Sequence, residues 1–150
     1  MKLPSLLFAV LLLTACSDAT EQDKNPSISE LRGQWVVVNY WAKWCKPCIR
    51  EIPELNALNR EYAEVTVLGV NYDGAEGEEL ASQISELEVK FPMLTEDPAG
   101  KLGAPRPLVL PTTLIINPAG KLIQTLIGPQ TLESLTAATE QSGTLPQESW

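Results

Sequence analysis

Residues 34–48, QWVVVNYWAKWCKPC, decide the fold. Residues 34–41 are β-branched and aromatic at most positions, which is typical of a strand buried on both faces. Cys45 and Cys48 follow three positions apart, and an apolar pattern with helical spacing then continues to about Tyr62. The sequence therefore predicts a strand, a short connection that carries a Cys-x-x-Cys pair, and a helix that begins at this pair.

Two cysteines at this spacing and place can close a small disulfide ring and reopen it. At the start of a helix, free N–H groups and the helix dipole stabilise the thiolate of Cys45. Lys46 adds a neighbouring positive charge, and Lys43 and Arg50 lie close by in the sequence. We therefore expect Cys45 to attack a substrate disulfide. Cys48, one turn into the helix and less exposed, is expected to resolve the mixed disulfide.

Three other uses of the cysteine pair are open at this point. A zinc site needs two more ligands, and the chain has no histidine and only three cysteines. Two thiolates could instead capture a soft metal ion such as copper(I). A purely structural disulfide is the third alternative, although so short a loop constrains the unfolded chain little.

Glu51 lies on the apolar side of the predicted helix. The apolar stripe, projected at about 100° per residue, includes Cys48, Ile52, Leu55, Leu58 and Tyr62. Glu51 is one turn from Cys48, the spacing at which helical side chains meet. A partly buried acid there would have a raised pKa and could carry the proton of Cys48. The alternative is a glutamate at the edge of the stripe whose carboxylate reaches water.

The rest of the domain alternates strands and helices. In chain order the expected elements are strand 65–71, helix 76–87, strands 112–116 and 122–127 joined by a turn at 117–120, and helix 132–140. This order, βαβα and then ββα, predicts an α/β fold with a central mixed sheet and helices on both faces.

Composition and charge limit the partners of the protein. A chain of 150 residues with 44% apolar and 20% charged residues suits one globular domain. Its formal charge of −8 gives no general attraction for nucleic acid or anionic lipid. Because the chain has no histidine, His-dependent catalytic triads and haem–His ligation are excluded. We expect no nucleic-acid partner and, since no exposed apolar stripe is evident, a monomer.

The N-terminus reads as a secretory signal. One positive charge at Lys2 precedes an apolar run over residues 3–13 and small residues before Cys16. Spanning a bilayer takes about twenty apolar residues, so this run is too short for a permanent transmembrane helix. The ending Leu-Thr-Ala-Cys16 resembles a bacterial lipobox, in which cleavage leaves a lipidated cysteine as the new N-terminus. Ordinary secretion, with Cys16 as an incidental thiol, is the alternative.

These features predict four segments. Residues 1–15 form the signal peptide, and residues 16–27 form a lipidated cysteine with a flexible polar tether. The ten residues 17–26 of this tether reach at most about 35 Å when extended. Residues 28–140 form the folded domain, and residues 141–150 form a loose tail. We therefore expect a lipid-anchored protein outside the cytoplasm, on the outer membrane if the organism has one, because Ser17 resembles the sorting pattern for that membrane.

Residues 40–48, YWAKWCKPC, followed by Glu51, Pro53 and Leu55, resemble the thioredoxin-like thiol–disulfide oxidoreductases. Within these, the chain looks most like the membrane-tethered TlpA/ResA type, associated with cytochrome c maturation and extracytoplasmic disulfide reduction. The resemblance covers about residues 28–140. It implies a thioredoxin fold with an insertion, residues 76–95, between the second strand and a cis-proline. It also implies protein substrates and no bound metal or organic cofactor.

The resemblance assigns roles to matching positions. Cys45 becomes the nucleophile and Cys48 the resolving thiol of a redox-active disulfide. Pro111 matches the cis-proline that lies against this pair, and with Leu110 it would contact substrate. Trp44 would shield the first cysteine and contact substrate. Glu51 matches the buried glutamate of ResA-like members.

The chain also departs from the family pattern. Cytosolic thioredoxins carry an aspartate where this chain has Asn39, which makes Glu51 the expected substitute for that acid. Leu110 is bulky, and residues 103–107 before it are rich in proline. Because this loop contacts substrate in the family, the identity of the substrate is the property that the resemblance predicts least well. Disulfide reduction is the expected direction, with electrons supplied by a membrane thiol-transport protein. A disulfide-forming oxidant and a tethered copper(I) chaperone are the alternatives.

Overall fold

The computed structural model describes residues 27–141. The predicted signal peptide, the lipidated Cys16, tether residues 17–26 and tail residues 142–150 lie outside this range. The elements in chain order are η1 (Ile28–Leu31), β1 (Trp35–Trp41), α1 (Lys46–Glu61), β2 (Val65–Asn71), α2 (Gly77–Glu86), η2 (Gly100–Leu102), β3 (Thr112–Ile116), β4 (Leu122–Ile127) and α3 (Leu132–Ala138). Each predicted strand and helix is present, with ends that differ by at most two residues.

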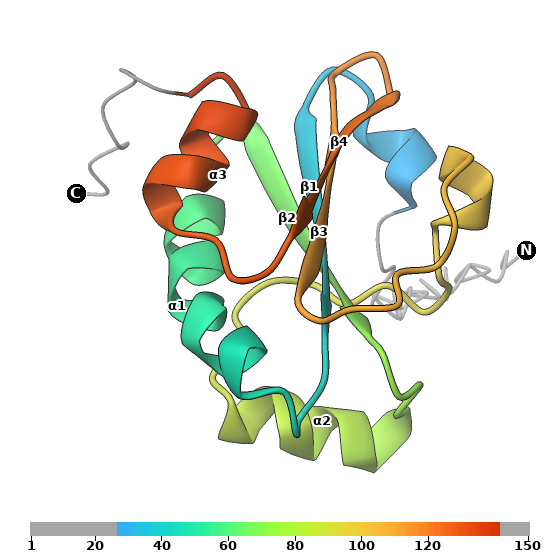
Figure 1. The fold of residues 1–150 in the computed structure, drawn as a ribbon, viewed down its shortest axis with the longest axis vertical. Coiled ribbons are helices and arrows are strands. Elements are labelled where there is room, and N and C mark those ends of the chain that lie inside the picture. The colour runs from blue at the N-terminus through green and yellow to red at the C-terminus, as the bar shows by residue number, and fades with distance from the viewer. Residues whose placement is uncertain (1–26, 142–150) are drawn as a thin grey trace, which may run out of the picture.

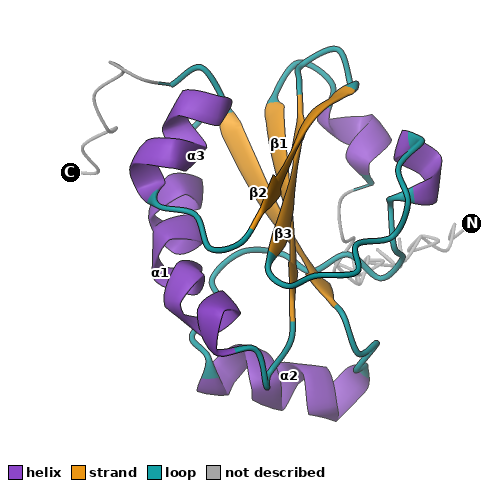
Figure 2. Ribbon diagram, viewed as in Figure 1, coloured by secondary structure: helices purple, strands orange, loops and turns teal. Residues whose placement is uncertain are grey.

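The four strands form one mixed sheet in the order β2-β1-β3-β4 (Figure 2). β1 runs parallel to β2 and antiparallel to β3, and β3 and β4 form the predicted antiparallel hairpin. The sheet is therefore mixed, as expected. Within it, the central strand β1 leads directly into the cysteine pair.

β1 is buried along its whole length, which explains its β-branched and aromatic sequence. Successive side chains of a strand point to opposite faces of the sheet. Val37 and Trp41 enter the apolar core that also contains α1, and Val36, Val38 and Tyr40 enter a second core on the other face. The strand thus joins the two cores of the domain.

The helices are distributed differently from the expectation. Figure 1 shows α1 and α3 together on one face of the sheet and α2 across its lower end. Partly buried apolar side chains of η1 and η2, with Leu94 and Leu110, pack against the core on the other face. The predicted helical layer on that face is therefore two 3₁₀ turns and irregular chain. Prolines at 98, 105 and 107 explain this, because proline removes a helical hydrogen bond.

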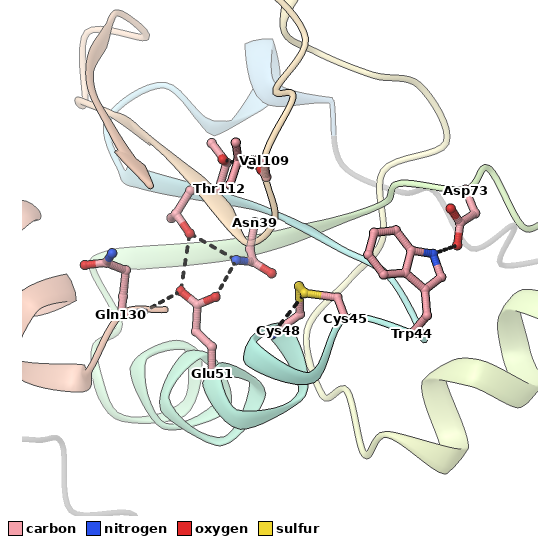
Figure 3. The surroundings of a disulfide bond; sticks show 10 residues. Asn39, Trp44, Cys45, Cys48, Glu51, Asp73, Val109, Thr112 and Gln130 are labelled. Carbon is pink, nitrogen blue, oxygen red and sulfur yellow. Dashed lines mark hydrogen bonds between the residues drawn. A yellow bond between two sulfur atoms is a disulfide. The ribbon is translucent and has the colours of Figure 1, made fainter. Parts of the chain in front are cut away.

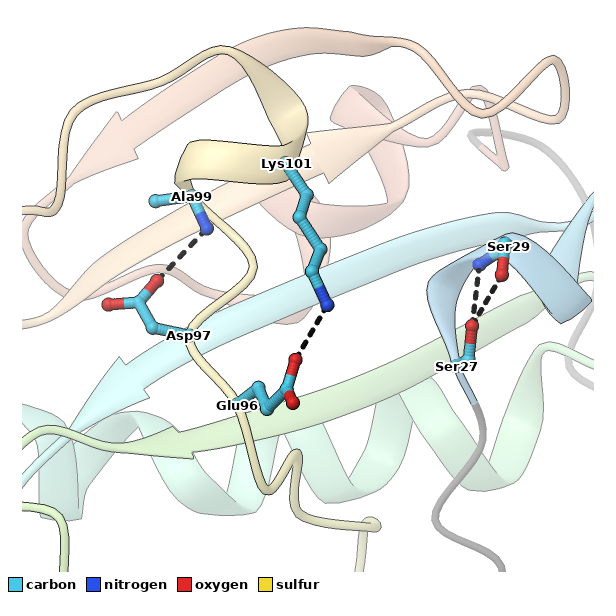
Figure 4. Close-up of polar contacts among 6 residues, drawn as sticks. All are labelled: Ser27, Ser29, Glu96, Asp97, Ala99 and Lys101. Carbon is cyan, nitrogen blue, oxygen red and sulfur yellow. Dashed lines mark hydrogen bonds and ion pairs between the residues drawn. The ribbon is translucent and has the colours of Figure 1, made fainter.

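Hydrogen bonds and an ion pair between residues close in the sequence stabilise these short turns (Figure 4). The Ser27 hydroxyl accepts a hydrogen bond from the Ser29 N–H and caps η1. The Asp97 carboxylate accepts one from the Ala99 N–H at 2.9 Å, at the start of η2, and Lys101 pairs with Glu96 at 2.6 Å.

Within residues 27–141, no helix has the length and apolar character needed to cross a bilayer.

Gly69 of β2 is the place where the end of the insertion docks on the sheet. Its N–H donates to the Pro92 carbonyl and its carbonyl accepts from the Leu94 N–H, both at 2.8 Å. A Cβ atom at this position would lie 2.5 Å from Met93 Sδ and 3.0 Å from Phe91 Cε2. The close approach requires a glycine within the strand.

We expect Gly69→Ala to lower the free energy of unfolding by about 1.5 kcal/mol, because the added methyl group overpacks this contact. Urea unfolding monitored by tryptophan fluorescence measures the change. Gly100→Ala is the matched control, since a Cβ there meets nothing within 4 Å. Equal midpoints for the two variants would contradict the explanation.

Candidate active site

Cys45 and Cys48 are joined by a disulfide at the start of α1, with their Cα atoms 5.3 Å apart. Cys45 is the N-cap of this helix, and its Sγ accepts a hydrogen bond from the Cys48 N–H at 3.2 Å. Pro47 occupies a first-turn position, where its missing N–H costs nothing. Cys45 is 4% exposed and Cys48 is 1% exposed. Cys48 is thus the less accessible sulfur, although both are almost completely buried.

Glu51 is buried, with a side chain 1% exposed, and it lies one turn after Cys48 on α1 (Figure 3). Its carboxylate accepts hydrogen bonds from Asn39 Nδ2 at 3.1 Å, from the Gln130 N–H at 3.2 Å and from Thr113 Oγ1 at 3.4 Å. Burial raises the pKa of Glu51 to about 7, and the three hydrogen bonds oppose this rise. The acid can therefore bind or release a proton near neutral pH.

The peptide bond between Leu110 and Pro111 is cis, as the resemblance implied. Strand register places this proline at the same end of the sheet as the cysteine pair. Tyr40 of β1 lies opposite Thr112 of β3, so the residues just beyond them, Trp41 and Pro111, emerge at the same end of the sheet. The first leads to Cys45, so the two parts of the predicted site, which are distant in the sequence, lie at the same end of the sheet.

Trp44 is 64% exposed, and its Nε1–H donates to Asp73 Oδ2 at 2.9 Å (Figure 3). The indole is thus held at the surface beside the disulfide by a residue that follows β2. Lys46 is exposed at the first position of α1. Lys43 pairs with Glu86 of α2 at 2.7 Å. Of the three cations expected near Cys45, one is therefore engaged by a carboxylate.

The loop before Pro111 is anchored to the sheet by a polar network. The Tyr40 hydroxyl donates to Asp97 Oδ1 at 2.6 Å, and Arg106 Nε pairs with Asp97 Oδ2 at 3.1 Å. Arg106 also donates to the Tyr72 carbonyl at 2.7 Å, and its guanidinium lies 4.3 Å from the centre of the Tyr72 ring. The Tyr72 hydroxyl donates to the Pro107 carbonyl at 3.1 Å. The network thus connects Asp97, at the start of the loop, and Arg106 and Pro107, nearer Pro111, to the ends of β1 and β2.

Burial, and then the hydrogen bond to Asp97, raise the pKa of Tyr40, so its hydroxyl stays a donor at all physiological pH values. We expect Tyr40→Phe to cost about 1.5 kcal/mol of unfolding free energy, because it removes a hydrogen bond to a charged group. The variant should also speed amide exchange in residues 97–107. Hydrogen exchange with mass spectrometry tests this, with Tyr62→Phe as the control. Unchanged exchange in this loop would contradict the anchoring role.

Sequence reasoning missed several residues around the site. Thr113 and Gln130 hydrogen-bond to Glu51 from positions 62 and 79 residues away in the chain, and no local pattern marks them. Leu108 is 93% exposed and Val109 is 54% exposed, just before the cis peptide bond. Their apolar character in a proline-rich loop was the signal that could have identified them.

A mixed sheet whose central strand ends in a disulfide-bonded Cys-x-x-Cys pair, with a cis-proline at the same end, defines a thioredoxin-like redox protein. Solved structures with this fold agree. A putative thioredoxin from Neisseria meningitidis has a TM-score of 0.62 at 22% identity, over 76% of this chain and 77% of its own. StoA from Bacillus subtilis has a TM-score of 0.58 at 23% identity, over 71% and 83%. The fold is thioredoxin-like.

Residues 12–125 match the AhpC/TSA family, and the chain belongs to this family. The thiol-disulfide oxidoreductase ResA from Bacillus cereus is 32% identical over 115 residues, which are 76% of this chain and 66% of that protein. The thioredoxin-like protein YneN from Bacillus subtilis is 30% identical over 119 residues, 77% of this chain and 69% of that protein. The chain spans just under two thirds of the length of the ResA protein from Bacillus cereus.

Proposed function

We propose that this protein exchanges thiols and disulfides with protein substrates, through the Cys45/Cys48 pair. The observation that carries the proposal is the disulfide at the start of α1 with the buried Glu51 carboxyl one turn away. The names of the ResA relatives support it. In this proposal Cys45 makes the first attack, Cys48 makes the second, and Glu51 accepts the proton of Cys48.

In the reducing direction, the Cys45 thiolate attacks one sulfur of a substrate disulfide. A mixed disulfide forms, and the other substrate sulfur leaves as a thiolate. Cys48 then loses its proton to the Glu51 carboxylate and attacks Cys45 Sγ. This second attack releases the remaining substrate thiolate and closes the Cys45–Cys48 disulfide, so two electrons pass from the protein to the substrate. Protons from Glu51 and from water then protonate the released thiolates according to pH.

Electrostatics and capping suit Cys45 to the first attack. In the oxidised protein its sulfur accepts the Cys48 N–H at 3.2 Å, and the same donor would stabilise a thiolate after reduction. The helix N-terminus acts in the same direction. Lys46 adds an exposed positive charge next in the chain. These features would favour the thiolate of Cys45, which is the form that attacks a disulfide.

The surface beside the disulfide suits an apolar, extended segment of a substrate protein. Trp44 exposes a large apolar side chain there, Leu108 and Val109 expose theirs in the loop just before the cis peptide bond, and Leu110 with Pro111 carries that bond. The Pro111 carbonyl accepts from the Gly128 N–H, so the backbone of Leu110, on the other side of the cis bond, is the proposed place for pairing with an added strand. Trp44, Leu110 and Pro111 are the proposed contacts of the substrate.

Reduction of substrates, including those of cytochrome c maturation, is the proposed direction. The supporting observations are the resemblance of residues 40–55 to the TlpA/ResA type and the ResA relatives. The signal-like residues 1–15 and the lipobox-like ending at Cys16 support a lipid-anchored location outside the cytoplasm. A reductant there must be recharged, so a membrane thiol-transport protein is the proposed electron donor.

The reduction potential of the Cys45/Cys48 pair tests the proposal. The full-length chain with Cys16→Ser is equilibrated with glutathione or dithiothreitol buffers, and the thiols are counted by alkylation and mass spectrometry. A value near about −270 mV, that of thioredoxin, supports a reductant, and a value near about −120 mV supports a disulfide-forming oxidant. If the pair does not equilibrate with these buffers, the proposed exchange function is refuted, and metal binding by the two thiolates is the hypothesis to test next.

A further inference from the structure

Asn39 carries a buried polar atom without a partner. The side chain is 1% exposed, in the middle of β1. Its Nδ2 donates to Glu51 Oε2 at 3.1 Å and to Thr113 Oγ1 at 3.0 Å, whereas its Oδ1 has no hydrogen-bond partner among the described residues. A buried acceptor left without a hydrogen bond costs free energy, so its persistence calls for an explanation.

The free oxygen points toward the redox pair. Asn39 lies on the same side of β1 as Val37 and Trp41, whose side chains share the core with Cys48. Figure 3 shows the carbonyl end of the amide directed toward the disulfide sulfurs and the nitrogen end directed toward Glu51. When Glu51 is ionised, exchanging the two ends would set the amide oxygen against the carboxylate oxygen Oε2, with no hydrogen between them. The contact to Glu51 therefore fixes which end faces the cysteines.

Reduction of the disulfide changes the hydrogen-bonding requirements of the two sulfur atoms. Breaking the S–S bond adds two electrons and gives each sulfur the capacity to carry a proton. Cys45 Sγ already accepts the Cys48 N–H at 3.2 Å, which favours its thiolate. Cys48 is 1% exposed and has no access to water as an acceptor for an S–H donor. An acceptor built into the core would satisfy it.

We propose that, in the reduced protein, Asn39 Oδ1 accepts a hydrogen bond from the thiol of Cys48. Asn39 is then a positioning residue that donates to Glu51 and accepts from Cys48. It keeps Cys48 protonated while Cys45 attacks, and it holds the proton acceptor, Glu51, beside the thiol that must later lose its proton. The proposal rests on the proposed function, because it concerns the dithiol state of the exchange cycle.

The groups around Cys48 and the neighbouring Glu51 carboxyl come from four elements. α1 supplies the titratable groups Cys45 and Glu51. β1 and β3 supply Asn39 and Thr113, and the segment before α3 supplies the Gln130 N–H, all of them uncharged. The nearby cations on α1, Lys46 and Arg50, are exposed. Glu51 is thus the charged group whose influence must be separated from that of Asn39.

The test is a per-residue pH titration of the reduced protein. The full-length chain with Cys16→Ser, labelled with ¹³Cβ-cysteine, gives one NMR signal for each of the two remaining cysteines. We expect Asn39→Leu to lower the pKa of Cys48 by about one unit, a tenfold larger thiolate-to-thiol ratio at a given pH, because the thiol loses its acceptor. If this variant does not fold, Asn39→Val removes the same oxygen with a residue that suits a strand.

Asn71→Leu is the matched control. Asn71 is also a buried asparagine on a neighbouring strand, but its Nδ2 donates to Gln83 and its Oδ1 accepts from the Ala75 N–H. It should lower stability and leave the pKa of Cys48 unchanged. An equal shift in both variants would show a general effect of loosened packing and overturn the proposal.

A Glu51→Gln background separates a direct contact from an effect through the acid. If Asn39 acts on Cys48 directly, Asn39→Leu still lowers the Cys48 pKa when residue 51 cannot titrate. Loss of the shift in this background would overturn the proposal. Insulin reduction by the parent protein, measured in parallel, tests exchange itself. A pKa shift without exchange refutes the proposed function alone, and exchange without the shift refutes the role of Asn39 alone.

Discussion

Cys45→Ser is expected to abolish catalysed disulfide reduction, with a loss of at least about 10³-fold in the rate of insulin reduction. Cys48→Ser should also lose multiple turnover, but it should retain the first attack. The two variants are expected to differ because the two cysteines occupy different places in α1. Cys45 caps α1 and has the N–H donor, whereas Cys48 lies behind it, closer to Glu51 in the core.

The two variants are compared in the Cys16→Ser chain, so that no other thiol reacts. Insulin turbidity with dithiothreitol as the electron source measures turnover, and mass spectrometry under non-reducing conditions detects covalent adducts. Cys48→Ser should accumulate a mixed disulfide through Cys45, and Cys45→Ser should accumulate none. Adducts through Cys48 in the second variant would reverse the assigned roles, and turnover by either variant would refute the dithiol mechanism.

Glu51 should make the stability of the protein depend on pH. The pKa of this carboxyl rises from 4.5 in the unfolded chain to about 7 in the folded protein, because of burial. Between these values the folded state holds a proton that the unfolded state has released. The contribution of Glu51 to the free energy of unfolding therefore falls as pH rises through this window, by about 3 kcal/mol in total, and is flat above it.

Glu51→Gln removes this titration, so we expect the difference in unfolding free energy between the variant and the parent to grow by about 3 kcal/mol from pH 4.5 to pH 8. Urea unfolding of the oxidised proteins across this range measures it, and the subtraction cancels the other carboxylates. A constant difference would contradict the raised pKa. The same variant should slow insulin reduction by about 10²-fold and lose the pH dependence near 7, because the acceptor of the Cys48 proton is gone.

Local patterns in the sequence predict the central unit of this fold well. The buried strand β1, the helix α1 and the burial of Glu51 all depend on residues within one continuous segment, where period-2 and helical spacing act over short distances. The cis bond at Pro111 could be predicted from a family resemblance, since base rates alone make such a bond rare.

What the sequence could not predict depends on tertiary contacts. The hydrogen bonds from Thr113 and Gln130 to Glu51 arise from strand register and from the path of a loop. The pairing of Lys43 with Glu86 depends on where α2 lies across the end of the sheet. The second face is covered by 3₁₀ turns and proline-rich chain, which have no periodic pattern to recognise.

The anchored loop before the cis-proline has a consequence for divergence within the family. Asp97 and Arg106 tie the loop to β1 and β2, and Pro111 leads into β3, so the fold holds the loop at both ends. Leu108, between these attachments, is almost fully exposed and contributes little to the folding energy. The tip can therefore change its sequence at low cost in stability. Paralogues could then acquire different clients while the same dithiol chemistry is inherited unchanged.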